Sequence, residues 1–505
     1  MQKEWLSWQK FQAVQELSEE EIVGTRWAHT DENSKPRLIA YHMAKKTDKT
    51  KEEVDKEYPC EAKSRLVVQG CQEDETNIRS DSPTCSLLAF NLVCTLAALF
   101  CWHCQFAKQW NQSTFDPALP ETSTSWARGS IHGTKDAGRR WMKRLRDATD
   151  CGWIASKALF FLYDGGVLIG VMASHVDDLI TCGAGEKHEK SMKDLTNTLH
   201  LKKKSGEFRF YGKNLVQPED KSISLEQVDA IEGLEYQVLD KHRRKFPNLP
   251  LAEQENSDSR ALIGSTGWVV RQTRPDIMVN VSIVSQSIGN PTIRDVIELN
   301  TAVKMLKDSA DAKWCFKASG ITVENCVVLM RADSSFANTG GFKSQCGYII
   351  GLTLHSITEG KDTPIIVIEA NSSSIKRVCR STLAAKANAY LAAEFALKPV
   401  IGFTDAKSLE STITKDAGQP SDKRVKILVA QVREMMEGVC ATHWLDTSQM
   451  LADVVTKLGC EREPLPRALA DGFWRIAPSE EALGKKMAIR AGRRQRKSSI
   501  GMGAA

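Results

Sequence analysis

The stretch VMASHVDDLITCG, residues 171–183, places two adjacent carboxylates, Asp177 and Asp178, between two apolar runs. An acid pair on its own is usually part of a solvated turn. Here the flanking segments LFFLY (159–163) and VLIGVM (167–172) are rich in the β-branched and aromatic residues that strands favour, and the intervening DGG is a hairpin signal. The pattern therefore predicts a buried hairpin that carries both acids at its end.

Burial of this acid pair has a chemical consequence. Carboxylates that lose their hydration must take up protons or be matched by a cation, and two adjacent ones favour a bound divalent metal. The stretch therefore indicates Mg²⁺ chemistry, with phosphoryl transfer as the favoured reaction.

The size and composition fit a soluble globular protein. The chain has 505 residues, 42% of them apolar and 26% charged, which is enough for about three domains. Its fourteen cysteines follow no disulfide spacing, so we expect reduced thiols and a cytoplasmic and/or nuclear location. The only Cys-x-x-Cys, CWHC at 101–104, has no second pair at zinc spacing and indicates buried thiols rather than a metal site.

No segment has the features of a membrane anchor. The N-terminal MQKEWLSWQKF lacks an apolar signal core. The longest apolar run, residues 87–102, is shorter than about 18 residues and is interrupted by Asn91 and Thr95. We expect a buried helix there and no membrane partner.

The basic residues are unevenly distributed. The net charge of +5 is modest, but there are clusters at KKK (202–204), KHRRK (241–245) and KKMAIRAGRRQRK (485–497), the last of which contains no acid. Such clusters are commonly solvated surface. A basic tail also fits contact with a phosphate backbone or a nuclear import signal, and these alternatives stay open.

Two further boundaries are visible along the chain. Pro, Asn and Ser cluster in residues 245–260, which indicates a break. Residues 273–288 look helical, with Pro275 where a first helical turn tolerates it. A third unit is expected near Val327, where VVLMRADSS predicts a strand that ends in an acid.

Six motifs, in this order, resemble the reverse transcriptase and ribonuclease H region of Ty1/copia-type retrotransposon polyproteins. The similarity covers about residues 4–457. The motifs are KSRLVVQG (63–70), SDSPTCSLLAFNLV (80–93), IHGTKDAGRRW (131–141), SHVDDLITCG (174–183), GSTGWVVRQTRPDI (264–277) and MLADVVTK (450–457).

The resemblance implies a multidomain protein of α/β and α+β class, with a right-hand polymerase palm and fingers followed by a ribonuclease H-like α/β domain. The chain resembles a piece of such a polyprotein, with no protease or integrase region before it. The implied domains are reverse transcriptase fingers and palm at 1–255, thumb or connection at 256–320, a ribonuclease H-like domain at 321–460 and a basic C-terminal tail at 461–505.

In the polymerase part, the resemblance makes HVDD the metal-binding hairpin of the palm. Asp177 is implied to be the principal metal ligand and Asp178 its weaker companion, with His175 at the family's aromatic position. FYGK (210–213) resembles the segment that steadies the primer end. The residues implied to contact the nucleotide and the template are Lys63, Arg65, Gly133 and Lys135.

A third carboxylate is required, because a two-metal polymerase must bridge both ions during in-line attack. The family supplies it from a short strand after the apolar helix, and Lys108 stands about where it is expected. The first Asp that follows, Asp116, lies in a Pro-containing stretch, and the linker to Ile131 looks too short for the strand and its loop. We therefore expect a deletion or degeneration near 103–125.

The ribonuclease H part is expected to have lost an acid as well. Asp333, Asp405 and Asp453 match three of the family's metal ligands, but the helix position of the fourth, a Glu, holds Lys386. Glu394 cannot replace it, because eight residues along a helix is about 12 Å and a rotation of roughly 80°.

The resemblance implies an RNA-directed DNA polymerase with ribonuclease H activity. Its cofactor would be Mg²⁺, with Mn²⁺ as an alternative, and its partners an RNA template, an RNA/DNA hybrid and deoxynucleoside triphosphates. Because both sites have a lysine in place of an acid, we expect catalysis to be degenerate. The alternatives are a non-catalytic nucleic-acid-binding remnant and a decayed transposon reading frame; the oligomeric state does not follow from the sequence.

Overall fold

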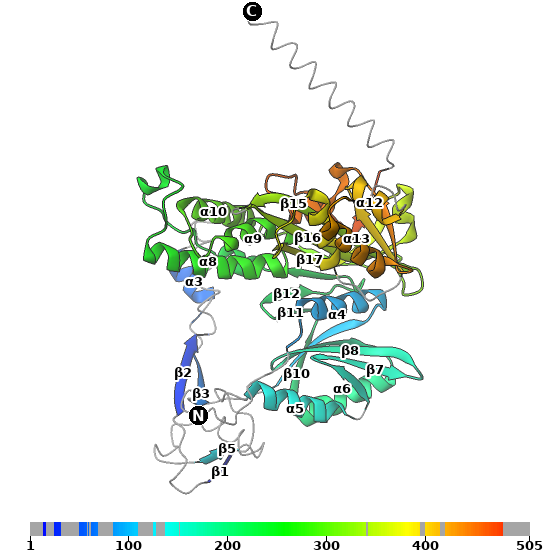
Figure 1. Ribbon diagram of the computed structural model, residues 1–505. Helices are drawn as coiled ribbons and strands as arrows, with labels where there is room; N and C mark the ends of the chain where they lie inside the picture. Colours follow the sequence, from blue (N-terminus) through cyan, green and yellow to red (C-terminus); the bar gives the residue numbers. More distant parts are fainter. Residues whose placement is uncertain are drawn as a thin grey trace, which may run out of the picture. The chain divides into compact units, whose positions relative to one another are not determined.

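The computed structural model (Figure 1) divides into two compact units, which are described separately: Met1–Val93 with Trp102–Gln217, and Cys94–Cys101 with Pro218–Ala505. In strands β1, β2, β3 and β5 it describes the backbone alone. The described residues are 14–16, 25–31, 50–57, 59, 62–68, 84–109, 125–127, 137–150, 152–339, 342–393, 399–414 and 420–477.

The first unit contains a six-stranded antiparallel sheet with the order β10-β4-β9-β8-β7-β6. The predicted hairpin is confirmed, since LFFLY and VLIGVM lie on neighbouring strands joined at the DGG turn. The strands are β4 His103–Gln109, β6 Trp153–Ser156, β7 Leu159–Asp164, β8 Val167–His175, β9 Asp178–Gly183 and β10 Leu201–Ser205.

Helices cover this sheet because alternate residues of its strands point to opposite faces. On β9, the Thr181 hydroxyl lies 3.7 Å from the Met192 sulfur of α6, whereas the neighbouring Cys182 thiol donates to the Val93 carbonyl of α4. Figure 1 shows α5 and α6 side by side on one face of the sheet. The helices are α4 Leu87–Leu99, α5 Ala137–Thr149 and α6 Glu186–Leu199.

The first unit also has smaller elements. β1 pairs with β5, and β2 pairs with β3, each antiparallel, while β11 and β12 form a hairpin. These elements are β1 Val14–Glu16, β2 Thr25–Asp31, α3 Lys51–Glu57, β3 Ala62–Val68, β5 Ser125–Ala127, β11 Glu207–Phe210 and β12 Lys213–Val216.

The second unit is built on a six-stranded mixed sheet with the order β19-β18-β15-β16-β17-β20. β15, β16 and β17 are antiparallel, and β18 and β19 continue from β15 in parallel. The strands are β15 Cys326–Thr339, β16 Lys343–Leu354, β17 Thr363–Ser374, β18 Val400–Thr404, β19 Cys440–Trp444 and β20 Phe473–Trp474.

Helices and short turns complete the second unit. A buried hydrophobic cluster joins α8, α9 and α10, and a strand pair, β13 Ile223–Glu226 with β14 Trp314–Phe316, flanks them in the sequence. The helices are α7 Val228–Glu232, α8 Glu253–Gln272, α9 Met278–Gln286, α10 Ile293–Asp308, α11 Thr382–Ala392, α12 Lys407–Thr414, α13 Lys423–Met436 and α14 Pro464–Asp471. The 3₁₀ turns are η2 Arg243–Lys245, η3 Pro275–Ile277, η5 His355–Glu359, η6 Thr447–Gln449 and η7 Leu451–Val455.

The helical cluster and the mixed sheet are joined by buried polar contacts. The Gln345 amide on β16 donates to the hydroxyls of Ser282 on α9 and Ser372 on β17, both at 2.8 Å, and its oxygen accepts from Gln286. Gln345 is fully buried, so these hydrogen bonds fix α9 against the sheet. The segment 256–320, which the sequence assigned to a thumb or connection, therefore lies in one compact unit with the mixed sheet. The domain bounds expected from the resemblance stay predictions.

Two local expectations can be compared with the structure. Pro275 opens η3 and leads into α9, as its position in a first helical turn predicts. Asp333 does not end its strand, however, because β15 runs on to Thr339 in a long pairing with β16. Within the described residues, no helix combines the length and apolarity that a bilayer crossing requires.

Candidate functional sites

The hairpin acid pair, Asp177 and Asp178, lies at the tight connection between β8 and β9. Asp178 begins β9 directly opposite His175, and Asp177 is in the turn. Val176 has a φ of 53°, a backbone region that β-branched residues rarely adopt. The two side chains stay partly accessible, at 32% for Asp177 and 23% for Asp178.

Lys108 is the cation that makes ion pairs with both acids of the hairpin acid pair. It lies on β4 directly opposite Asp178, and its Nζ is 2.9 Å from Asp178 Oδ1 and 3.4 Å from Asp177 Oδ2. Burial disfavours the ammonium, but contact with Asp178 and the charge of Asp177 outweigh it and raise the pKa of Lys108. A two-metal site would require a carboxylate on this neighbouring strand. The side chain that β4 places beside the acid pair is instead the positively charged Lys108.

This geometry corrects part of the expectation for residues 103–125. The strand that the sequence suggested was missing is present as β4, between β9 and β10 in the sheet. Lys108, at the position where the resemblance places an acid, therefore lies within an intact strand. Asp116 and the rest of 110–124 lie outside the described residues.

The FYGK segment packs beside the hairpin acid pair. Tyr211 and Gly212, with φ values of 47° and 70°, form the turn between β11 and β12, and the Tyr211 ring lies 3.9 Å from that of His175. Lys213 is fully buried, with its Nζ over the rings of Phe90 at 4.2 Å and Tyr211 at 4.9 Å. Burial lowers the pKa of His175, so its ring is held in the neutral form.

The predicted nucleotide and template contacts remain predictions. Lys63 and Arg65 lie on β3, opposite Thr30 and Ala28 of β2, in a segment whose backbone alone is described. The other two residues, Gly133 and Lys135, fall outside the described residues.

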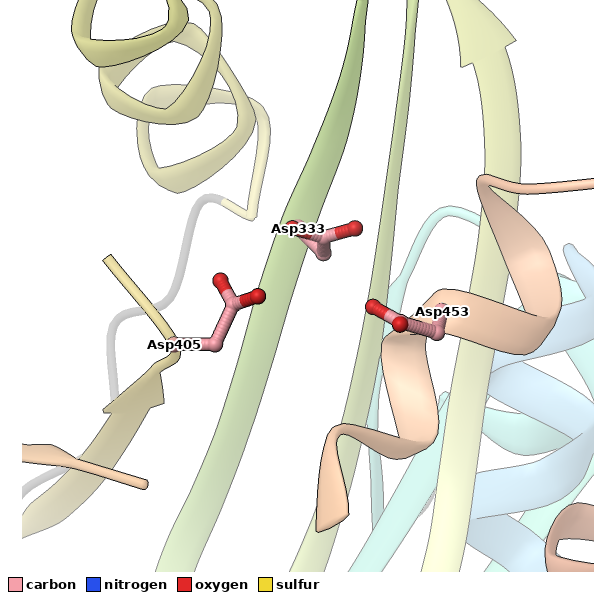
Figure 2. Close-up of side chains that lie close together, drawn as sticks. All are labelled: Asp333, Asp405 and Asp453. Carbon is pink, nitrogen blue, oxygen red and sulfur yellow. The ribbon is translucent and has the colours of Figure 1, made fainter. Parts of the chain in front are cut away.

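The second site is the three-acid cluster, formed by Asp333, Asp405 and Asp453 (Figure 2). Asp333 comes from the middle of β15, Asp405 follows the end of β18, and Asp453 lies in η7. One carboxylate oxygen from each lies within 4.8 Å of the others. Within the described residues this is the only group of three or more metal-ligating side chains, so CWHC belongs to none.

Lys386 extends from α11 into the three-acid cluster. Its Nζ makes ion pairs with both Asp333 Oδ1 and Asp405 Oδ1. The lysine is only 6% exposed and Asp333 is fully buried. Burial disfavours the ammonium, but the charges of these two carboxylates raise the pKa of Lys386, so the group stays protonated between them. The other sequence candidate on this segment, Glu394, lies outside the described residues.

Lys457 is a second cation at the three-acid cluster, and the sequence did not single it out. Its Nζ is 2.7 Å from Asp453 Oδ1 and 3.3 Å from Asp333 Oδ2, and the Thr456 hydroxyl donates to Asp333 Oδ2 at 2.7 Å. Burial works against ionisation of Asp333, yet Lys386 and Lys457 outweigh it and lower the pKa of its carboxyl. Burial, with the charge of Asp333, raises the pKa of Asp453 to about 7.

Gly347 positions this cluster without contributing a polar group. It lies directly opposite Asp333 in the β15–β16 pair. A Cβ at this position would lie 2.7 Å from Val455 Cγ2 and 2.9 Å from both Asn371 O and Thr456 Cγ2. The missing side chain therefore lets η7, which carries Asp453, approach the sheet closely.

The residues of the three-acid cluster do not fit a pair of Mg²⁺ ions. Carboxylate oxygens are the ligands that this hard cation prefers, and three converge here. The two ammonium groups of Lys386 and Lys457 nevertheless contact all three acids, and because the pKa of Asp453 is raised to about 7 they offset most of the negative charge that would hold the ions. Lys386 directly contacts the two oxygens that a bridging ion would need.

The comparisons with known proteins gave structural matches alone. No protein-family model and no curated protein sequence matches the chain. The ribonuclease H1 of Halobacterium salinarum is 16% identical, with a TM-score of 0.21, over 25% of this chain and 92% of that one. The LC11 ribonuclease H1 bound to an RNA/DNA hybrid is 13% identical, with a TM-score of 0.20, over 25% and 92%.

A longer match is to the protease-reverse transcriptase of prototype foamy virus. It is 8% identical, with a TM-score of 0.22, over 86% of this chain and 72% of that one. At these identities and TM-scores the matches carry no functional argument, so function is inferred below from the geometry of this chain.

Proposed function

We propose that this chain is a reverse transcriptase and ribonuclease H region derived from a Ty1/copia-type retrotransposon polyprotein, in which lysine ammonium groups have replaced the catalytic metal ions. In this proposal the chain binds an RNA template or an RNA/DNA hybrid but neither extends a primer nor cleaves RNA. The observation that carries it is the ion pairing of buried Lys386 with both Asp333 and Asp405.

The second unit supports the ribonuclease H part. Three antiparallel strands are followed by two strands parallel to the first, and the acids come from the middle of β15, from the residue after β18 and from η7. An α/β sheet that brings acids from three separate segments together suits metal-dependent phosphodiester chemistry. In the proposed protein Lys386 stabilises the acids but supplies no Lewis acid, so the arrangement does not cleave RNA. The domain that carries it is retained for binding.

The first unit supports the polymerase part in the same way. An acid pair in a hairpin turn lies beside a strand whose facing residue is Lys108. Replacement of an acid by a lysine in each of two independent sites favours loss of both activities over damage to one. Deoxynucleoside triphosphate contacts at Lys63 and Arg65 are proposed from the resemblance alone.

A basic surface on α5 supports nucleic-acid binding. The helix carries five cationic side chains and one acid, Asp147, while its apolar residues Trp141, Met142 and Leu145 are buried. The edge strand β10 adds three consecutive lysines that are exposed. Lys and Arg on a surface attract the phosphate backbone irrespective of its sequence. The cationic residues of α5 are Arg139, Arg140, Lys143, Arg144 and Arg146.

The binding step can be tested with a fluorescently labelled RNA/DNA hybrid titrated with the full chain at several salt concentrations. We expect affinity that falls steeply with salt, and a weaker dependence in Arg140→Gln/Lys143→Gln, because fewer counterions are released. Lys193→Gln on α6 is the matched control and should bind as the parent does. Absence of binding at low salt by a folded, monodisperse chain would reject the proposal, whereas failure to obtain a monodisperse chain would favour a decayed reading frame.

The catalytic step needs separate assays. Primer extension on a homopolymer template and cleavage of the hybrid should both stay at background with Mg²⁺ or Mn²⁺. The competing function is an active polymerase or nuclease, for which the convergence of three carboxylates is the favourable observation. Metal-dependent turnover by the unmodified chain would establish that function and overturn ours.

A further inference from the structure

A surface pocket in the second unit has none of the three clustered acids in its lining. Its volume is about 520 Å³, within the range of about 300–1,000 Å³ typical of small-molecule sites. β20 borders it and pairs with Thr363 and Pro364 at the start of β17, whereas the register partner of Gly347, opposite Asp333, is Ser372.

The pocket is built by a short turn between α14 and β20. Arg467 and Asp471 lie one helical turn apart on α14, and Gly472, with a φ of 75°, reverses the chain into β20. A residue distant in the sequence stabilises this turn: Lys317 Nζ donates a hydrogen bond to the Ala470 carbonyl at 2.9 Å. The lining residues are Asp362, Arg467, Asp471, Phe473, Trp474 and Arg475.

Two aromatic residues form the apolar part of the lining. Phe473 is 43% exposed, so one face of its ring is open to a stacking partner. Trp474 is half-buried, and its ring lies 5.3 Å from the guanidinium of fully buried Arg331. The indole Nε1 of Trp474 is buried without a hydrogen-bond partner among the described residues.

The charged part of the lining is balanced. Two guanidinium groups and two carboxylates cancel formally, so a bare anion gains little net attraction from the pocket. A ligand with both an anionic group and N–H donors would satisfy both sets. Arg475 is placed by its own contact, since its Nε donates to the Gly360 carbonyl at 2.7 Å.

We propose that this pocket binds a nucleotide and prefers guanine. The base stacks on Phe473, and its Watson–Crick edge offers two neighbouring N–H donors that one carboxylate, from Asp471 or Asp362, accepts together. The phosphate meets the guanidinium groups of Arg467 and Arg475, which suit phosphate oxygens. The site goes beyond the proposed function, because neither acid cluster takes part in it.

The test is a calorimetric titration of the full chain with GMP, compared with AMP, UMP and inorganic phosphate. We expect GMP to bind most tightly and phosphate alone not to bind measurably. Phe473→Leu, Arg467→Gln and Asp471→Asn should each weaken GMP binding by about ten-fold, the size of effect found when a stacking partner is lost. Phe246→Leu, at a 50% exposed phenylalanine outside the lining, is the matched control and should leave binding unchanged.

Competition distinguishes a free nucleotide from one within a strand. If a short single-stranded RNA containing one guanine displaces GMP, the natural ligand is a residue of a strand; if it does not, the pocket takes free nucleotides. Both outcomes support the proposal. Equal binding of all three nucleotides, no GMP binding, or unchanged affinity in all three lining variants would overturn it. Hybrid binding through α5 is measured with a different ligand, so its failure would be seen separately.

Discussion

Replacing Lys386 should convert the three-acid cluster into a metal site. Its ammonium contacts both Asp333 and Asp405. A divalent ion held by these carboxylates would compete with this ammonium group; for scale, charges of +2 and +1 separated by about 4 Å repel by roughly 8 kcal/mol at an effective dielectric constant of about 20. If solvent and neighbouring charges reduce this fourfold, about 2 kcal/mol remains, which is about 30-fold in a dissociation constant.

The same substitution should weaken the fold in the absence of metal. Asp333 is fully buried, and loss of one partner of a buried ion pair costs about 3–5 kcal/mol. Lys386→Gln should therefore unfold at lower urea in EDTA and regain stability when Mn²⁺ is added, and Lys386→Glu should do so more strongly and recover part of the hybrid cleavage.

The assays are urea unfolding with and without Mn²⁺, calorimetric Mn²⁺ titration and cleavage of a labelled RNA/DNA hybrid. Lys304→Gln, at a 67% exposed lysine of the same unit, is the control and should change none of them. A Lys386→Glu chain that is folded yet binds Mn²⁺ no better than the parent would refute the idea that Lys386 occupies the ion position.

Three further predictions concern single residues. Lys108→Asp should create Mn²⁺ binding in the first unit by the same charge argument, measured by calorimetry; binding equal to the parent's would contradict it. Gly347→Ala should lower the free energy of unfolding by about 1–3 kcal/mol, seen as a lower urea midpoint, because the new Cβ would lie 2.7 Å from Val455. Gly264→Ala, where a Cβ would have nothing within 4 Å, should not lower it. Burial and the charge of Lys203 lower the pKa of His188 from 6.5 to about 4, so between these pH values the unfolded chain binds more protons than the folded one. The stability contributed by neutral His188 is therefore complete above pH 6.5, and about 3 kcal/mol of it is lost as the pH falls to about 4. Urea midpoints measured against pH should show this loss, and a His188→Asn chain should not.

Local pattern was sufficient for several of the chain's elements. Alternation and the DGG turn predicted the β7–β8 hairpin, and the proline position predicted the start of the segment that contains α9. These features depend on residues close together in the chain, so their energies can be read from short windows. The packing of the helical cluster on the mixed sheet could not be obtained this way, because the contacts of Gln345 with Ser282 and Ser372 span long stretches of sequence.

The candidate sites divide in the same manner. Asp333, Asp405, Asp453 and the positively charged position 386 were all identified from the sequence, and the structure brings them together. Lys457 was missed because a lysine four residues after an acid is common on any helical turn, and nothing local shows that it also reaches Asp333.

The sequence by itself determined which side chains are available: the acids of both sites, and lysines at positions 108 and 386. Only the tertiary structure decided what those lysines do. The register of β4 against β9 brings Lys108 to Asp178, and the packing of α11 on β15 brings Lys386 between two acids. The physical reason is that Coulomb energy depends on separation in space and on burial, and neither quantity is encoded in the spacing of residues along the chain.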